Sequence, residues 1–393
     1  MLRATDDHRR ARLARRHGVA PAHRYGDVTS ATRAMTALHA TEPATPHLSL
    51  HARVNEVDVA DVEAALYDTR TLVKVMGMRR TLFVVPPELI DAIAGSVGRR
   101  VADANRKRLE REAAALGLGP RWIDDARSAV LTALDGEQRS TRELRDAIEH
   151  FGGTFVAAAG TKWATDVPVM ANLLTIFCAE GAVVRARNRG HWRISRPTYT
   201  SMAGWLGRAV EPVDEAAGYA ELVRRWLWTF GPGTEADLVW WLGATKRAVR
   251  RALVDVGALE VVLDDGTTGF VLPDDTDDLT AAADREPWVA LLPTLDATTM
   301  GWRGREFYLD PGHVPFLFDT AGNAGTTVWV DGRVVGCWIQ DDDGRVRTIL
   351  RESLPRSAHR LLAAEVERLD ALLGGERITN VFASPQMRGE RLG

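Results

Sequence analysis

Apolar residues recur at helical spacing through most of the chain, and at three places this pattern changes to a pair of short β-branched runs. In the first block, residues 29–86, Met35 and Leu38 share one face of a predicted helix that Pro43 prevents from continuing. A further helix follows Asp58, a residue type that caps helix starts. The polar residues between Leu38 and Pro43 are therefore expected at a helix end.

The first block ends in two runs of β-branched and apolar residues, 72–76 and 81–85. Residues 77–80 between them, Gly-Met-Arg-Arg, are typical of a hairpin turn. Helices followed by a hairpin are the order of a winged helix, a module that commonly docks on nucleic acid.

The same order of helices and hairpin occurs twice more. Residues 123–200 show helical patterns followed by predicted wing strands at 183–185 and 192–194. Residues 201–273 repeat the order, and residues 87–122 are expected to form connecting helices. Three divergent copies of one unit are therefore predicted.

The last part of the chain, residues 274–393, changes to a β pattern. It begins with an acidic linker up to Glu286, and the dipeptide Asp-Gly at 331–332 between two apolar runs is a strong hairpin signal. The strands indicate a small barrel or curled sheet, closed by a helix over residues 355–373. The predicted fold class is α+β, with three tandem winged-helix modules around a small β-barrel and a basic N-terminal arm at residues 1–28.

The composition is that of an ordinary soluble protein, with 393 residues of which 45% are hydrophobic and 26% charged. The longest mostly apolar run, residues 167–179, is shorter than the ~20 residues that a membrane span needs. The charged first 23 residues lack the apolar centre of a signal peptide. Cys178 and Cys337 lie far apart in apolar runs, which favours free thiols over a disulfide. We therefore expect a cytoplasmic protein.

A net charge of -3 supplies no general attraction to DNA, so any contact must come from local basic patches. Residues 8–17 form one such patch, either a solvated arm or a phosphate contact. Arg79 and Arg80 in the first wing are predicted to contact phosphate, with a solvated turn as the alternative. Charge, position and aromatic neighbours predict further DNA contacts at Lys162, Arg185, Arg187, Arg189, His191 and Trp192.

Motifs for common cofactors and nucleophiles are missing from the sequence. It contains no P-loop, dinucleotide fingerprint, paired-cysteine motif, His-Glu-x-x-His or Gly-x-Ser-x-Gly. We therefore expect no cofactor and no metal. His39, Thr41 and Glu42 bring an imidazole, a hydroxyl and a carboxylate close together. They form either a reactive site or polar residues that cap and solvate a helix end.

Four stretches carry a recognisable pattern: residues 38–43 (LHATEP), 78–86 (MRRTLFVVP), 291–303 (LLPTLDATTMGWR) and 322–336 (GNAGTTVWVDGRVVG). Together they resemble the AlkZ/YcaQ-like winged-helix DNA glycosylases. In relatives the first stretch is similar to Leu-Gln-Ala-Gln-Asp-Pro, and the second to Met-Arg-Gly-Thr-Leu-His-Leu-Val. The resemblance implies three winged helices around a small barrel and hydrolysis of the N-glycosidic bond of alkylated purines, including crosslinked N7-alkylguanine.

The family's catalytic pair, the first and third residues of Gln-x-Gln or Gln-x-Asp, falls on His39 and Thr41, so both positions have changed type. The resemblance then implies that neutral His39 accepts a proton from the attacking water and that Thr41 orients this water. Glu42, where relatives carry Asp, would place negative charge toward the sugar cation. A histidine base predicts a rate that falls below pH ~6.5, where imidazole protonates.

The leading interpretation is a monofunctional DNA glycosylase for alkylated purines, acting in DNA repair or in self-resistance to a genotoxin. Its expected partner is damaged double-stranded DNA. We expect the protein to act as a monomer and to have no membrane partner. One alternative is a non-catalytic DNA-binding protein, either a regulator or a damage-recognition module. Another is a protein that uses its winged helices to bind other proteins, in which case DNA association would be weak and insensitive to salt.

Overall fold

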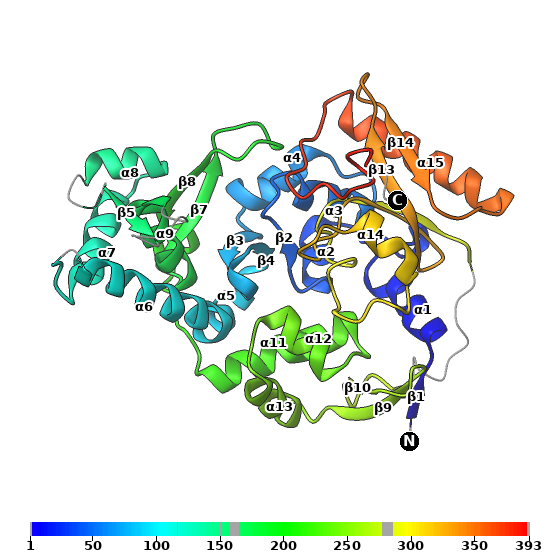
Figure 1. The fold of residues 1–393 in the computed structure, drawn as a ribbon, viewed down its shortest axis with the longest axis horizontal. Helices are drawn as coiled ribbons and strands as arrows, with labels where there is room; N and C mark the ends of the chain where they lie inside the picture. Colours follow the sequence, from blue (N-terminus) through cyan, green and yellow to red (C-terminus); the bar gives the residue numbers. More distant parts are fainter. Residues whose placement is uncertain are drawn as a thin grey trace.

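The computed structural model describes residues 2–115, 117–148, 151, 153–157, 165–276 and 286–390. Lys162 and most of the predicted acidic linker lie outside the described residues. The first block occupies the middle of the molecule, and the second block extends to one side of it (Figure 1). The third block and the C-terminal sheet cover other sides of the first block, so the predicted catalytic motif lies near the centre.

The first block combines short helices with a three-stranded antiparallel sheet of order β2-β4-β3. Its elements are α2 (Val28–Ala34), β2 (Leu38–His39), α3 (Thr45–Arg53), α4 (Val59–Glu63), β3 (Val73–Met76) and β4 (Leu82–Val85). A π-helical turn, Ala64–Asp68, extends α4, and a 3₁₀ turn, Met78–Arg80, joins β3 to β4. Asp58 caps α4 in a reciprocal capping box, which confirms the predicted helix start.

The predicted helix over residues 30–38 is wrong at its end. The helix stops at Ala34, and Leu38 and His39 form a strand. The free backbone edge of β4 explains the difference, because Leu38 pairs opposite Val84 and is fully buried there. The predicted catalytic motif therefore starts in a sheet and not at a helix end.

The connecting helices lie before the second block, which contains two hairpins, and α10 follows it. The elements are α5 (Ile90–Ile93), a π-helical turn (Ala94–Gly98), α6 (Arg99–Ala115), α7 (Trp122–Ala133), α8 (Thr141–Ala147), β5 (Thr154–Ala157), β6 (Thr165–Pro168), α9 (Val169–Ala179), β7 (Val183–Asn188), β8 (Pro197–Ser201) and α10 (Met202–Leu206).

The predicted wing strand at residues 192–194 is wrong. These residues form turns, and the strand opposite β7 is β8. The side-chain amide of Asn188 donates to the carbonyl oxygens of Gly190 and Ile194, at 3.2 and 2.9 Å. These bonds fold the residues into a compact loop, because they satisfy backbone groups that a strand would pair.

The third block consists of α11 (Glu215–Phe230), α12 (Glu235–Leu242), α13 (Lys246–Asp255), β9 (Leu259–Leu263) and β10 (Thr268–Val271). The N-terminal residues pack on this block: β1 (Leu2–Ala4) pairs in parallel with β9, and α1 (Asp6–Arg16) follows it. Arg12 is only 2% exposed, and both Arg12 and Arg16 bind the carboxylate of Asp275. The basic patch is therefore folded against the protein.

The C-terminal part contains a four-stranded antiparallel sheet, β11-β12-β13-β14, next to two helices. The elements are β11 (Val289–Leu292), α14 (Val314–Leu317), β12 (Thr327–Val330), β13 (Arg333–Gln340), β14 (Val346–Leu350) and α15 (Arg356–Leu373). The predicted barrel is not found in the described residues, since β11 and β14 lie at opposite edges of an open sheet. Four strands are too few to close, and α15 packs on this sheet instead.

The predicted α+β class is confirmed, while the division into three winged helices stays a prediction. One core joins the first and third blocks with residues 288–337, a second lies within α6 to α9, and a third lies between the C-terminal sheet and α15. Cys178 and Cys337 are both buried free thiols. Among the described residues, no helix has the length and apolar character required to cross a membrane.

Candidate active site

His39 is the last residue of β2, and the strand holds its imidazole in an almost closed environment. The residue pairs opposite Phe83 of β4, and the two rings lie 4.5 Å apart between centroids. The side chain of His39 is 5% exposed. The candidate base is thus fixed by a neighbouring strand and a packed aromatic ring.

Arg79 lies directly beside this imidazole. It belongs to the turn between β3 and β4, and its Nη2 is 3.4 Å from Nε2 of His39. A guanidinium only donates hydrogen bonds, so Nε2 is the acceptor and the neutral ring carries its proton on Nδ1. Nδ1 is buried and has no hydrogen-bond partner among the described residues. A water molecule or a substrate atom that reached Nδ1 would therefore find a free donor.

His39 stays neutral at physiological pH in this environment. Burial, helped by the positive charge of Arg79, lowers its pKa from 6.5 to about 3. The loss of rate below pH ~6.5 that an ordinary imidazole would produce is therefore no longer expected. The neutral form persists down to far more acidic conditions.

Thr41, the second candidate residue, is exposed. Between it and His39, the buried Ala40 donates its N–H to the carbonyl oxygen of Leu82 at 2.8 Å, so pairing with β4 continues past the end of β2. Thr41 itself lies in the bend that follows this pairing. The motif thus combines a buried imidazole with an accessible hydroxyl.

Glu42 has structural partners that the sequence did not predict. Its Oε1 accepts the backbone N–H groups of Val381 and Phe382, at 2.5 and 3.0 Å, although these residues lie more than three hundred positions away. The side chain of Glu42 is 3% exposed, and burial raises its pKa against the opposing effect of the two N–H groups. Glu42 is therefore a positioning residue that holds the C-terminal segment beside the motif.

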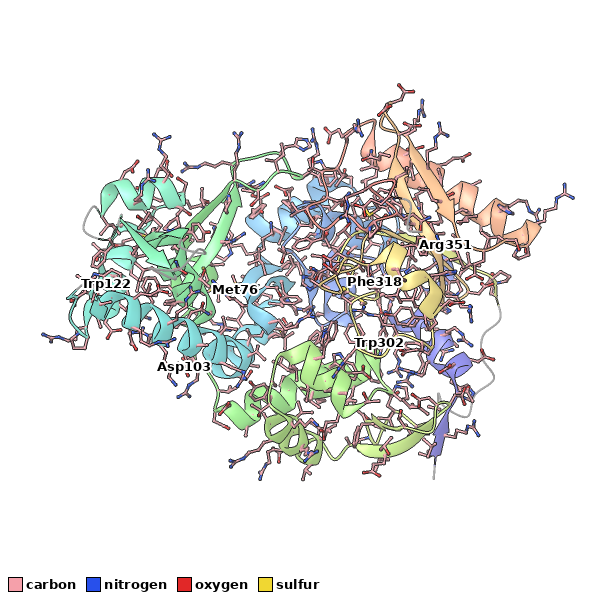
Figure 2. The ribbon with its side chains drawn as sticks, viewed as in Figure 1. Met76, Asp103, Trp122, Trp302, Phe318 and Arg351 are labelled. Carbon is pink, nitrogen blue, oxygen red and sulfur yellow. The ribbon has the colours of Figure 1, made fainter. Side chains whose placement is uncertain are left out.

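Two further side chains surround Arg79. Its guanidinium carbon lies 4.2 Å from the ring centroid of Trp240 on α12, and that of Arg305 lies 5.5 Å from the same centroid. Arg305 also lies 4.4 Å from the ring of Phe318. Phe318 follows α14 and is labelled in Figure 2. Sequence reasoning missed Arg305, because the contact joins parts of the chain that no local pattern connects. The nearby stretch at residues 291–303 was its only signal.

The second wing makes its contacts within the protein. Arg187 pairs with Asp68, Arg189 with Glu143 at 2.6 Å, and His191 with Glu376 at 3.1 Å. These pairs join β7 and the loop after it to the turn after α4, to α8 and to the segment after α15. Arg187, Arg189 and His191 would each first have to exchange a carboxylate for a phosphate.

Trp192 lies in the core and not on the surface of this loop. It is 8% exposed, packs 5.2 Å from the ring of His47, and donates from Nε1 to Glu376 at 3.2 Å. A ring buried in this way cannot stack on a base in this arrangement. Arg185 lies 6.0 Å from the ring of Tyr199 and forms no ion pair with a described residue. Arg80 in the first wing is exposed.

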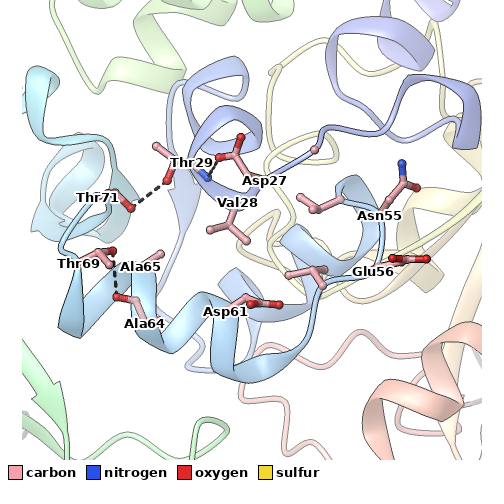
Figure 3. Close-up of a pocket in the computed structure, with 13 residues that line it drawn as sticks. Asp27, Val28, Thr29, Asn55, Glu56, Asp61, Ala64, Ala65, Thr69 and Thr71 are labelled. Atoms are coloured by element: carbon pink, nitrogen blue, oxygen red, sulfur yellow. Dashed lines mark hydrogen bonds between the residues drawn. The ribbon is translucent and has the colours of Figure 1, made fainter.

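A cavity of about 440 Å³ lies between α2 and α4, and none of the predicted site residues lines it (Figure 3). Its wall includes the carboxylates of Asp27, Glu56 and Asp61. Asp27 and Asp61 are already engaged in capping α2 and α4. Acidic walls repel phosphate, so this cavity does not continue the candidate DNA surface.

Comparison with known proteins gives a consistent result. A sequence model described as "DNA glycosylase AlkZ-like" matches residues 32–372. The "Interstrand DNA cross-link repair glycosylase" of Streptomyces sahachiroi is 28% identical over 308 residues, which cover 76% of this chain and 79% of the relative. The solved structure of the Streptomyces sahachiroi DNA glycosylase AlkZ superposes with a TM-score of 0.75 at 20% identity, covering 96% of this chain and 99% of that one. The family match spans β2, the first wing and the C-terminal sheet, and the chain accordingly belongs to the AlkZ-like DNA glycosylase family.

Proposed function

We propose that this protein hydrolyses the N-glycosidic bond of alkylated purines in duplex DNA, with N7-alkylguanine and N3-alkyladenine as substrates. One observation carries the proposal: a neutral imidazole and an accessible hydroxyl, His39 and Thr41, stand at the two positions where the family carries its catalytic pair. The name of the Streptomyces sahachiroi relative, a cross-link repair glycosylase, extends the proposed substrates to crosslinked purines. Such an activity serves DNA repair or self-resistance to a genotoxin.

The chemistry makes modest demands on the protein. A purine alkylated at N7 is cationic, so it leaves as a neutral base when the C1′–N9 bond breaks and its electron pair moves onto the purine. Water then forms a bond with C1′ of the oxocarbenium-like sugar and loses a proton. The protein must position this water and accept its proton, which is the work of a general base.

His39 and Thr41 divide this work between them. The Thr41 hydroxyl orients the water, and His39 accepts its proton. For this step the lone pair on Nε2 must be free, whereas in the protein without DNA it accepts a hydrogen bond from Arg79. Arg79 therefore has to turn toward another acceptor when DNA binds. At 3.4 Å its bond to His39 is long and weak, which favours the exchange.

The test is release of N7-methylguanine from duplex DNA by the wild type and by His39→Ala and Thr41→Ala. We expect both substitutions to lower the single-turnover rate by about 100-fold or more, a usual size for general-base catalysis, while DNA binding is kept. His51→Ala and Thr71→Ala are matched controls, since His51 is another buried histidine and Thr71 another exposed threonine in the first block. Rates that fall equally in the controls would contradict a catalytic pair.

A second candidate is a DNA-binding protein without catalysis. The observation that favours it is the enclosure of His39, which is 5% exposed and capped by Arg79. Binding to alkylated duplexes, with no base released from any of them, would establish this function instead.

A further inference from the structure

Arg79 and Arg305 come from distant parts of the chain and meet on one aromatic ring. Both guanidinium carbons lie within 6 Å of the ring centroid of Trp240. Their like charges repel each other, and the repulsion by Arg305 adds to burial in lowering the pKa of Arg79 to about 10. The fold therefore keeps two positive charges on one ring at an energetic cost, and one of them, Arg79, lies beside His39.

Neither guanidinium has a carboxylate partner among the described residues. Arg305 donates from Nη2 to the carbonyl oxygen of Gly322 at 3.2 Å, and Arg79 reaches only His39. The Nε atoms of both arginines are buried and have no hydrogen-bond partner there. Both side chains are partly buried, and cations that are partly shielded from water in this way are normally paired, so this pair can accept an anion.

The backbone that presents Arg79 is also unusual. Arg79 and its neighbour Arg80 have φ angles of 54° and 60°, in the left-handed region that favours glycine. Two consecutive non-glycine residues in this region persist only where the surroundings hold them, which is typical of functional sites. The turn therefore holds Arg79 over Trp240 at the expense of local strain.

We propose that Arg79 and Arg305 together bind one phosphodiester of the DNA backbone next to the damaged nucleotide. Two planar guanidiniums offer a phosphate several parallel donors, and the Trp240 ring fixes their position. A phosphate oxygen is a stronger acceptor than a neutral imidazole, so it draws Arg79 away from Nε2 of His39. The phosphate site thereby frees the base only when DNA is bound. This inference rests on the proposed function for the identity of the anion.

The test uses the full chain and a duplex with a tetrahydrofuran abasic analogue, which cannot be cleaved at a glycosidic bond. Single phosphates around the analogue are replaced in turn by uncharged methylphosphonates. At one position, we expect the methylphosphonate to weaken DNA binding by the wild type. At the same position it should not weaken DNA binding by Arg305→Gln any further. The slope of log affinity against log salt should fall by about 0.9 in Arg305→Gln, the value for one lost phosphate contact.

Three further arms keep the result interpretable. Arg79→Lys retains the positive charge and should keep the salt slope while it weakens binding, because a lysine cannot form the bidentate contact. Arg347→Gln is the matched control, since Arg347 on β14 is exposed and paired with Asp341 at 2.8 Å. Inorganic phosphate at constant ionic strength should not compete with the duplex. Strong competition, with no position-dependent loss in the scan, would assign the pair to a free anion and overturn the proposal.

The outcome is separable from that of the proposed function. If Arg305→Gln has the wild-type salt slope and the wild-type methylphosphonate pattern, the phosphate site is wrong, even when base release persists. If the wild type releases no base, but Arg305→Gln lacks the salt slope and the methylphosphonate pattern of the wild type, the phosphate site stands and the glycosylase proposal fails.

Discussion

The guanidinium of Arg53 and the carboxylate of Asp296, 243 residues apart in sequence, form an ion pair in which both side chains are 0% exposed. The pair joins α3 of the first block to the loop after β11. The Ser49 hydroxyl donates to the Asp296 carboxylate, and Arg53 donates to the Thr298 hydroxyl. Asp296 also acts electrostatically on His39. The candidate motif therefore lies beside a buried connection between the first block and the C-terminal part of the chain.

Loss of one member of this pair should be costly. Arg53→Met leaves the carboxylate of Asp296 buried without its partner, and we expect the free energy of unfolding to fall by about 3–5 kcal/mol. Urea denaturation measures this change. The control is Arg33→Met, which removes a surface pair with Glu88 whose members are 53% and 39% exposed and should cost less than about 1 kcal/mol. Equal effects of the two substitutions would contradict the role given to Asp296.

Glu42 should control the C-terminal segment. In Glu42→Ala the N–H groups of Val381 and Phe382 lose their acceptor, and their hydrogen exchange should accelerate by about tenfold or more, since bonds to a charged group are worth about 1.5–3 kcal/mol. Exchange measured by mass spectrometry reports this locally. Glu42→Gln keeps a carbonyl acceptor and should show a smaller effect. Unchanged exchange in the alanine variant would show that other contacts hold the segment.

The strain at Arg80 predicts an unusual order of stabilities. Arg80 has a φ of 60°, and a Cβ in this left-handed region costs roughly 1–2 kcal/mol. Arg80→Gly relieves this strain. The glycine also gives the unfolded chain more conformational entropy, which lowers stability by about 0.5–1 kcal/mol, so the free energy of unfolding should change by less than about 1 kcal/mol.

Arg80→Val should be clearly less stable than Arg80→Gly, because β-branched residues tolerate positive φ poorly. Thermal melting gives the order. The reference substitution is Arg142→Val on α8, where the arginine side chain is 84% exposed and the loss of helix propensity and of a surface ion pair with Asp146 costs less than about 1 kcal/mol. A valine variant as stable as the glycine variant would exclude strain at this position.

Buried neutral histidines should make the protein sensitive to acid. Burial lowers the pKa values of His17, His39 and His51 to about 3. As the pH falls through about 6.5, each of these histidines binds a proton in the unfolded chain but not in the folded chain. Their contribution to the free energy of unfolding is therefore fully present above that pH and is lost as the pH falls toward 3. In this pH range, each histidine lowers the free energy of unfolding by about 1.4 kcal/mol per pH unit.

Urea denaturation at pH 7.5, 6.0 and 5.0 measures the loss of stability. His51→Gln should remove about one third of the slope that these histidines produce, if it folds like the wild type. Stability that is the same at pH 7.5 and 5.0 would mean that the imidazoles can be protonated without unfolding.

Local signals in the sequence predicted local structure well. Asp58 marks the start of α4 through a capping box, and the turn residues of the first wing separate β3 from β4. The strand at Leu38 and His39 was missed, since it depends on the free edge of β4. The loop at Trp192 was also missed, because its shape depends on the side chain of Asn188 and on burial against His47.

Only part of the candidate site could be predicted, because only that part depends on local sequence. The motif of His39 and Thr41 is contiguous and resembles that of known relatives, so it could be found from sequence. Arg305 and the segment bound by Glu42 reach the motif only through tertiary packing. The pKa of His39 likewise depends on burial and on Arg79, which the sequence alone does not reveal.

The decisive measurement is the single-turnover release of N7-methylguanine from duplex DNA between pH 5.5 and 7.5, by the wild type and by His39→Ala. With a His39 pKa of about 3, the wild-type rate should be constant across this range, and the alanine variant should release almost no base at any pH. A wild-type rate that falls with a midpoint near pH 6.5, or equal release by His39→Ala, would contradict catalysis by a buried neutral His39.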